Sequence, residues 1–253
     1  MQVETYIDSK GLKRCKVCNA LKEIRMRSGR VQPCICKCEE AEDKAQAERI
    51  RLEGIKSVNK SKAWAVGTAT ATQAATFRND NGKTPQLMEY CRKYADEFST
   101  SSPWLVLWGN VGTGKSYAAA AICNEILEHG YSVRFTTLTQ FERELFSTQD
   151  KAGAYAELRR VDLLVLDDLG ISRATPYMNE IMFTVVDERL RTGKPMIVTT
   201  NMSRDEMTSG KASMDVARIL SRLYEKAYFI RCCGEDQRLA ALRERGGGLA
   251  FDE

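Results

Sequence analysis

The chain has 253 residues, a net charge of +4, 43% hydrophobic residues and 28% charged residues. These values are ordinary for a globular protein and leave room for one large domain, or a medium domain with a small module. No run approaches the roughly 20 apolar residues that cross a bilayer, and the first ten residues lack the apolar segment of a signal peptide. The sequence therefore predicts a cytoplasmic protein with no membrane contact, whose mild positive charge permits nucleic-acid binding without requiring it.

The first feature along the chain is a cluster of cysteines. Five of the nine cysteines fall between residues 15 and 38: Cys15, Cys18, Cys34, Cys36 and Cys38. In a reducing compartment such a cluster indicates a metal site more than disulfides. A C-x₂-C pair followed by a second group at this distance fits a tetrahedral zinc site, although reduced structural cysteines are the alternative.

The zinc site has more candidates than positions. We expect Cys15 and Cys18 to be ligands and the other two to come from Cys34, Cys36 and Cys38. The basic stretch between the two groups can form a small hairpin around residues 27–30. So short a segment has little core, so metal binding would supply its folding energy.

The composition then changes twice. A charged helix is expected over residues 39–56, ending near Gly54, because acidic residues crowd its start and basic ones its end. Residues 61–86 are expected to be an irregular connection. We therefore predict a zinc-binding module over 1–39, a charged helical linker over 40–62 and a main domain over 63–253.

From residue 85 onward, helical patterns alternate with apolar strands. The expected helices are 86–98, 115–128, 139–147, 151–159, 176–191 and 213–225, and the expected strands are 104–108, 132–136, 162–167, 195–200 and 227–232. Five strands separated by helices predict an α/β fold with a five-stranded parallel sheet covered on both faces.

A phosphate-binding motif, G-x-x-x-x-G-K-[ST], follows the first of these strands and opens the next helix. Its residues are Gly109, Asn110, Val111, Gly112, Thr113, Gly114, Lys115 and Ser116. Backbone amides and the helix start would hold the phosphates, with Lys115 on the β- and γ-phosphates and the Ser116 hydroxyl on Mg²⁺. Tyr117, the next residue, is included in this predicted nucleotide site.

Polar residues at two later strand ends complete the expected site. Asp167 ends an apolar strand, where it can reach the Mg²⁺, and Asp168 is the candidate to polarise the attacking water. Asn201 ends the next strand. In AAA+ ATPases a polar residue at that place senses the γ-phosphate, which is the role expected of Asn201; a cap for the following turn is the alternative.

Several segments together resemble one family. They are "LLVLDDLG", "GKPMIVTTN", "ARILSRL" and "GEDQR", within residues 60–240. The combination resembles the bacterial replicative helicase loaders, a DnaC/DnaI-like AAA+ group that includes the IstB transposition helpers. The resemblance implies an AAA+ P-loop NTPase fold with a short lid, binding ATP and Mg²⁺.

The resemblance also assigns two arginines. Arg222 matches the arginine finger that reaches the ATP of a neighbouring subunit, with Arg218 as second candidate and a pair with Glu225 as the structural alternative. Arg238 matches the arginine that contacts ATP within the same chain. The family more often has Ser-Tyr where this chain has Asp236 and Gln237, and the alternative is that Arg238 is a solvated arginine on a basic C-terminal helix.

The resemblance implies partners as well. They are a replicative hexameric helicase, held by residues 1–60, single-stranded DNA, and other copies of the chain in an ATP-dependent homo-oligomer. Asp167-Asp168 replaces the Asp-Glu pair of many AAA+ motors, which predicts slow hydrolysis, suited to a switch.

No dedicated DNA-binding motif is present. The candidates for contact with bases or phosphates are Phe141, Arg143, Lys151, Arg159 and Arg160. Burial of Phe141 in the core, with the basic residues merely solvated, is the alternative.

Three functions are therefore compared. The first is an ATP-dependent helicase loader in DNA replication, which the zinc module favours. The second is an IstB-type helper that recruits a transposase to target DNA. The third is a zinc-dependent regulator that binds nucleotide without turnover.

Overall fold

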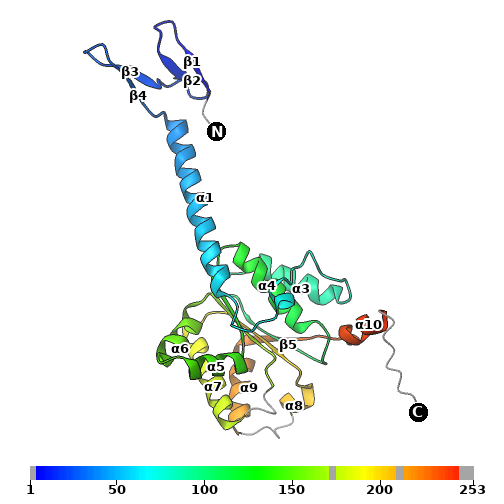
Figure 1. Cartoon of the computed structure of the whole chain (residues 1–253). Coiled ribbons are helices and arrows are strands. Elements are labelled where there is room, and N and C mark those ends of the chain that lie inside the picture. The colour runs from blue at the N-terminus through cyan, green and yellow to red at the C-terminus, as the bar shows by residue number, and fades with distance from the viewer. Residues whose placement is uncertain (1–3, 171–174, 209–213, 245–253) are drawn as a thin grey trace. The chain divides into compact units, whose positions relative to one another are not determined.

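The computed structural model describes residues 4–170, 175–208 and 214–244 (Figure 1). Its internal contacts divide the chain into two units, Met1–Ile55 and Lys56–Glu253. The three-part division expected from the sequence stays a prediction, and the two units are described separately below.

The first unit contains two short antiparallel hairpins. β1 (Thr5–Ile7) pairs with β2 (Lys13–Cys15), and β3 (Glu23–Arg25) pairs with β4 (Val31–Pro33). The β3–β4 pair is the hairpin that the basic stretch predicted. Within the described part of this unit, the buried side chains are Cys15 and Cys36. The described residues of this unit therefore form no apolar core of their own.

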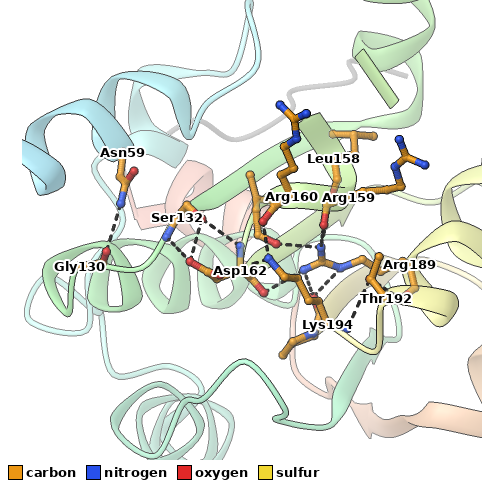
Figure 2. Close-up of polar contacts among 12 residues, drawn as sticks. Asn59, Gly130, Ser132, Leu158, Arg159, Arg160, Asp162, Arg189, Thr192 and Lys194 are labelled. Carbon is orange, nitrogen blue, oxygen red and sulfur yellow. Dashed lines mark hydrogen bonds and ion pairs between the residues drawn. The ribbon is translucent and has the colours of Figure 1, made fainter. Parts of the chain in front are cut away.

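A single long helix, α1 (Lys37–Lys62), follows the hairpins. The predicted end near Gly54 is wrong, because the helix continues through this glycine for two further turns. Glycine inside a helix costs only about 1 kcal/mol relative to alanine, and tertiary contacts stabilise the chain beyond it. The Asn59 side chain donates a hydrogen bond to the Gly130 carbonyl at 3.1 Å (Figure 2), and Phe135 N donates to Ala63 O at 2.6 Å.

The second unit is built on a five-stranded parallel sheet in the order β6-β7-β8-β5-β9. The strands are β5 (Trp104–Trp108), β6 (Val133–Thr137), β7 (Leu163–Asp167), β8 (Met196–Thr200) and β9 (Ala227–Arg231). All five predicted strands are confirmed to within one residue at each end. The strand order and the covering helices confirm the predicted AAA+ P-loop fold class.

Helices cover both faces of this sheet (Figure 1). They are α2 (Thr70–Gln73), α3 (Pro85–Asp96), α4 (Lys115–Glu128), α5 (Leu138–Ser147), α6 (Lys151–Arg160), α7 (Pro176–Thr192), α8 (Arg204–Thr208), α9 (Met214–Lys226) and α10 (Gln237–Glu244). Successive strand side chains point to opposite faces. Leu105 and Leu107 therefore pack with α3 and α4, whereas Val106 packs with α7 and α9.

Two short helices were not anticipated. α2 lies within residues 61–86, which the sequence predicted to be irregular throughout, and α8 follows the turn after Asn201. Both have five residues or fewer, too few for a helical period to be visible in the sequence. Among the described residues, no helix has the length and apolar character to cross a membrane.

A buried arginine, Arg189, binds the chain at the amino-terminal edge of the sheet, opposite the carboxyl edge where the phosphate loop lies. Arg189, on α7, is 1% exposed and donates six hydrogen bonds to backbone carbonyls (Figure 2). The acceptors are the carbonyls of Leu158, Arg159, Val161, Asp162 and Pro195. Burial lowers the pKa of Arg189 to about 10, opposed by the Asp162 carboxylate and by Tyr94. One side chain thus joins the end of α6 to the starts of β7 and β8.

Candidate nucleotide site and cysteine cluster

The phosphate loop lies where the sequence predicted it, between β5 and α4, at the carboxyl edge of the sheet. It borders a cavity of about 460 Å³. The lining residues are Val111, Gly112, Thr113, Gly114, Lys115, Ser116, Tyr117, Thr137, Asp167, Asp168, Thr199, Asn201, Gln237 and Arg238. The structure therefore gathers most of the predicted site residues around one cavity.

Two glycines of the loop have no room for a side chain. A Cβ at Gly112, where φ is +75°, would lie 2.1 Å from the Asp236 carboxylate. A Cβ at Gly109, where φ is +138°, would lie 2.3 Å from the Cys232 carbonyl oxygen. Only glycine tolerates both the backbone conformation and the close approach. The loop is thus pressed against the segment that follows β9.

Lys115 is 6% exposed, and its ammonium donates to the carbonyls of Gly109 at 2.8 Å and Asn110 at 2.5 Å. Burial lowers the pKa of Lys115, and the negative charges near it, including those of Asp167 and Asp168, oppose that shift. The Lys115 ammonium is hydrogen-bonded to carbonyls of the phosphate loop itself. The phosphate oxygens of a nucleotide can replace these carbonyls as its partners.

Asp167 ends β7 and accepts a hydrogen bond from the Thr199 hydroxyl at 2.6 Å. Burial raises the pKa of Asp167, while hydrogen bonds from Thr199 and Ser116 lower it. A half-buried carboxylate beside a serine hydroxyl is an oxygen donor set that suits Mg²⁺. The residues present therefore fit the predicted magnesium position.

Asp168 has a left-handed backbone, with φ at +54°, which is uncommon for a non-glycine residue. Its N–H donates to the Thr199 hydroxyl at 2.8 Å, and its Oδ1 accepts from the Asn201 amide at 3.0 Å. Asn201 is thus joined to Asp168 across the ends of β7 and β8.

Sequence reasoning missed Thr199. Its hydroxyl contacts both aspartates, and it holds the turn after β7 in place. The available signal was a pair of threonines ending an otherwise apolar strand, but their facing partners become known only from the β7–β8 register.

The segment after β9 contacts the loop directly. Gln237 N donates to the Gly112 carbonyl at 3.0 Å, and the Asn81 side chain donates to the Gln237 side chain at 2.9 Å. Asp236 caps the following helix by accepting from Arg238 N at 2.9 Å. Arg238 lines the cavity even though Asp236 and Gln237 depart from the family pattern.

Arg222 lies elsewhere. It is on α9 and does not line the cavity; its NH2 is 3.2 Å from Asp187 on α7. The partner is thus Asp187 and not Glu225, the alternative expected from the sequence. Arg218 lies one turn earlier, with its guanidinium 4.9 Å from the centre of the Phe183 ring. Neither arginine contacts the nucleotide cavity of its own chain.

The structure confirms the alternative given for Phe141, burial in the core, and so excludes this residue from the candidates for DNA contact. Phe141 is fully buried and packs edge-on against Tyr155 at 5.2 Å. The spacing of Leu138, Phe141 and Leu145 places all three on the inner face of α5. The exposed aromatic side chain of this helix is Phe146, 68% exposed and 5.8 Å from Tyr177.

The basic DNA candidates remain on the surface. Arg143, Lys151, Arg159 and Arg160 are all exposed. Arg159 lies 3.5 Å from Glu188, whereas no ion pair is found for the other three among the described residues.

Four of the five candidate cysteines lie together in the structure. The sulfurs of Cys15, Cys18, Cys36 and Cys38 all lie within 4.8 Å of one another. Cys34 lies outside this group, and its thiol donates to the Leu21 carbonyl at 3.0 Å. Tetrahedral zinc with bonds of about 2.3 Å requires sulfurs about 3.8 Å apart, so the arrangement fits the ion.

The surroundings of the sulfurs also favour a cation. The neighbouring Cys18 thiol raises the pKa of Cys38 to about 11. The N–H groups of Val17 and Cys18 point to the Cys15 sulfur at 3.4 and 3.5 Å. Four crowded sulfurs are stable as thiolates only beside a positive ion, so zinc would supply structural stability here.

Comparison with known proteins assigns most of the second unit to a protein family. The profile of the IstB-like ATP binding protein family matches residues 70–245. The chain belongs to this family. Residues 1–69, which include the cysteine cluster, lie outside the match.

Two of the relatives of this chain are replicative helicase loaders. The replicative helicase loader DnaC of Escherichia coli strain K12 is 34% identical over 140 residues, which are 53% of this chain and 57% of DnaC. The replicative helicase loader DnaI of Bacillus subtilis strain 168 is 31% identical over 146 residues, 53% of this chain and 47% of DnaI. The chain thus spans about half the length of these relatives. The predicted DnaC/DnaI-like resemblance is confirmed.

The fold has solved counterparts. A crystal structure of DnaI superposes with a TM-score of 0.58 at 23% identity, covering 71% of this chain and 99% of that one. This likeness supports the fold, and the family's ATP-binding character supports nucleotide binding at the cavity.

Proposed function

We propose that this IstB-like protein is an ATP-switched helicase loader that binds single-stranded DNA and delivers a replicative hexameric helicase. The observation that carries the proposal is the nucleotide cavity, where the ends of β7 and β8 and the segment after β9 all meet the phosphate loop. The relatives named replicative helicase loaders supply the biological context.

The cavity residues have distinct roles in this proposal. The loop amides and Lys115 bind the phosphates, and Arg238 contacts ATP from the same chain. Ser116 and Asp167 would hold Mg²⁺, which neutralises charge on the β- and γ-phosphates. Asp168 orients the attacking water and accepts its proton, while Asn201 fixes the Asp168 carboxylate through their hydrogen bond.

Hydrolysis requires a second copy in this proposal. Arg222 contacts Asp187 and lies away from its own cavity, so it is available to the nucleotide of a neighbouring chain. An arginine inserted from outside stabilises charge on the transferring phosphoryl group. A chain that hydrolyses only within an assembly behaves as a switch, and slow turnover follows from the short Asp168 side chain.

The remaining surfaces would bind the partners. The cysteine-clustered first unit would hold the helicase. Single-stranded DNA would meet Arg143, Lys151 and Arg160, with Phe146 available for stacking on a base.

The test measures both ATP turnover by the protein and its capture of the helicase. Steady-state ATPase activity is measured with and without single-stranded DNA, and helicase is captured on immobilised protein in each nucleotide state. Lys115→Ala should lose nucleotide binding by about 100-fold or more, and Arg222→Ala should keep binding and lose turnover. Normal hydrolysis by Arg222→Ala would exclude the finger role; no helicase capture in any state would exclude the loader.

An IstB-type transposition helper is the second candidate, because the chain belongs to the IstB-like ATP binding protein family. Capture of a transposase in place of a helicase would support it. A regulator without turnover would release no phosphate above the Lys115→Ala background.

A further inference from the structure

The positive charge of the chain is concentrated in its first unit. Residues 4–38 contain nine of the 38 Lys and Arg residues but three of the 34 Asp and Glu residues. The rest of the chain, with 29 basic against 31 acidic residues, is slightly acidic. Four thiolates around one Zn²⁺ would lower the charge of the first unit by about two and still leave it positive. This asymmetry favours a polyanionic partner for the first unit.

Three arginines of the β3–β4 hairpin carry the part of this charge that lacks acidic partners. Arg25, Arg27 and Arg30 have no ion-pair partner among residues 4–170, 175–208 and 214–244, and the sequence has no acidic residue between Glu23 and Glu39. Other basic residues of the same unit are paired: Arg14 with Asp8, Lys16 with Glu4 and Lys22 with Glu39. The hairpin arginines are therefore available to an external anion.

The hairpin presents these arginines on an ordered backbone. Every residue from 24 to 33 is exposed. Near the turn, Met26 N donates to the Arg30 carbonyl at 2.8 Å, and at the base Cys34 N donates to the Lys22 carbonyl at 2.8 Å. A ligand would thus meet arginines whose backbone is already fixed, which reduces the entropy cost of binding.

Apolar side chains lie between the arginines and are exposed with them. Ile24, Met26 and Val31 are 51%, 49% and 46% exposed. Guanidinium groups bind phosphate oxygens in pairs and stack on bases, while the apolar side chains can lie against base faces. A single strand offers both phosphates and uncovered bases, whereas a duplex covers its bases and an acidic protein surface has no repeated flat rings. Single-stranded nucleic acid is therefore the polyanion that fits this hairpin.

We propose that the β3–β4 hairpin of the first unit binds single-stranded nucleic acid, with Arg25, Arg27 and Arg30 on its phosphates. This site is additional to the surface of the second unit to which the proposed function assigns DNA. It requires neither ATP nor the helicase, so its binding can be measured separately from loading.

The first test removes the three charges. The affinity of the zinc-loaded chain for labelled oligothymidylate and oligouridylate is measured at several salt concentrations. Arg25→Gln with Arg27→Gln and Arg30→Gln should weaken binding about tenfold or more. The slope of log affinity against log salt should fall in magnitude by about 2, because each phosphate contact on a single strand contributes about 0.7. Tighter binding of one oligonucleotide identifies DNA or RNA as the preferred ligand.

The matched control removes three exposed basic residues from α1 in the same unit. Lys44→Gln with Arg49→Gln and Arg51→Gln should keep the wild-type affinity and salt slope. Both variants should retain about one zinc per chain, which verifies that the module is still folded.

The outcomes separate this site from the proposed function. A hairpin variant with wild-type affinity and salt slope overturns the inference, as does an equal loss in the α1 control or tighter binding to a duplex of the same length. Lost helicase capture with unchanged oligonucleotide affinity also overturns it, because the hairpin then belongs to the helicase surface. Reduced oligonucleotide affinity with normal DNA-free ATP turnover supports it. A wild type that binds oligonucleotide through the hairpin yet captures no helicase counts against the proposed function alone.

Discussion

Each of the two units of the chain is stabilised internally in a different way. In the first, the buried side chains of the described part are two cysteines, and the strands have three residues each. In the second, two apolar layers sandwich a parallel sheet. A small module can therefore replace hydrophobic burial with ligand bonds to a metal, and the two units should respond to different perturbations.

Metal removal should have the largest effect, confined to the first unit. Structural zinc sites contribute about 10 kcal/mol or more to folding. Treatment with a strong chelator, or Cys15→Ser, should abolish hydrogen-exchange protection in β1–β4 and leave the sheet of the second unit protected. Cys34→Ser is the matched control and should keep about one zinc per chain. Unchanged protection of the hairpins after complete zinc loss would contradict this expectation.

Arg189→Met should have the next largest effect, now confined to the second unit. It removes six hydrogen bonds and leaves five backbone carbonyls, of which those of Leu158 and Pro195 are buried, to find other donors. We expect a loss of about 3 kcal/mol, or roughly 6–12 °C in Tm, by calorimetry. Arg191→Met on the same helix removes a largely exposed arginine whose partner, Asp187, still has Arg222 within ion-pair distance, so it should cost less than about 0.5 kcal/mol. Equal losses of unfolding free energy for both variants would contradict a special role of Arg189 in stability.

Asp167→Asn should separate stability from function within the second unit. Burial raises the pKa of Asp167, so the folded state binds its proton more tightly than the unfolded state does. Between the two pKa values, wild-type stability therefore falls as pH rises, and the ionised form is a cost at neutral pH. The nucleotide-free variant should gain about 1 kcal/mol at pH 7 and less at pH 4, and should lose magnesium-dependent nucleotide binding. A variant less stable than the wild type at pH 7 would refute the assignment.

Gly54→Ala should have the smallest effect and tests the helix that leads from one unit into the other. A Cβ at Gly54 would meet no atom within 4 Å, so the variant should gain about 0.5–1 kcal/mol of helix stability. Hydrogen exchange of the α1 amides around Gly54 should slow. Gly193→Ala is the informative control, because the site is equally open but φ is +67°, so this variant should lose stability.

The contrast between the units also separates what sequence could predict from what it could not. Continuous apolar runs predicted every strand of the sheet, and a contiguous motif predicted the phosphate loop. The partners of Thr199 and Arg222 depend on register and on helix packing, which no contiguous pattern encodes. The separation of Cys34 from the other four candidate sulfurs and the end of α1 both depend on contacts between residues distant in the sequence.

The contact between the phosphate loop and the segment after β9 has a mechanical consequence. Gly112 has no space between itself and Asp236, and Gln237 bonds both to the loop and to Asn81. A load applied to α10 would therefore act on the phosphate loop as well as on β9. A partner that pulls on this helix could eject nucleotide without unfolding the domain, and nucleotide in the cavity would in turn resist the pull.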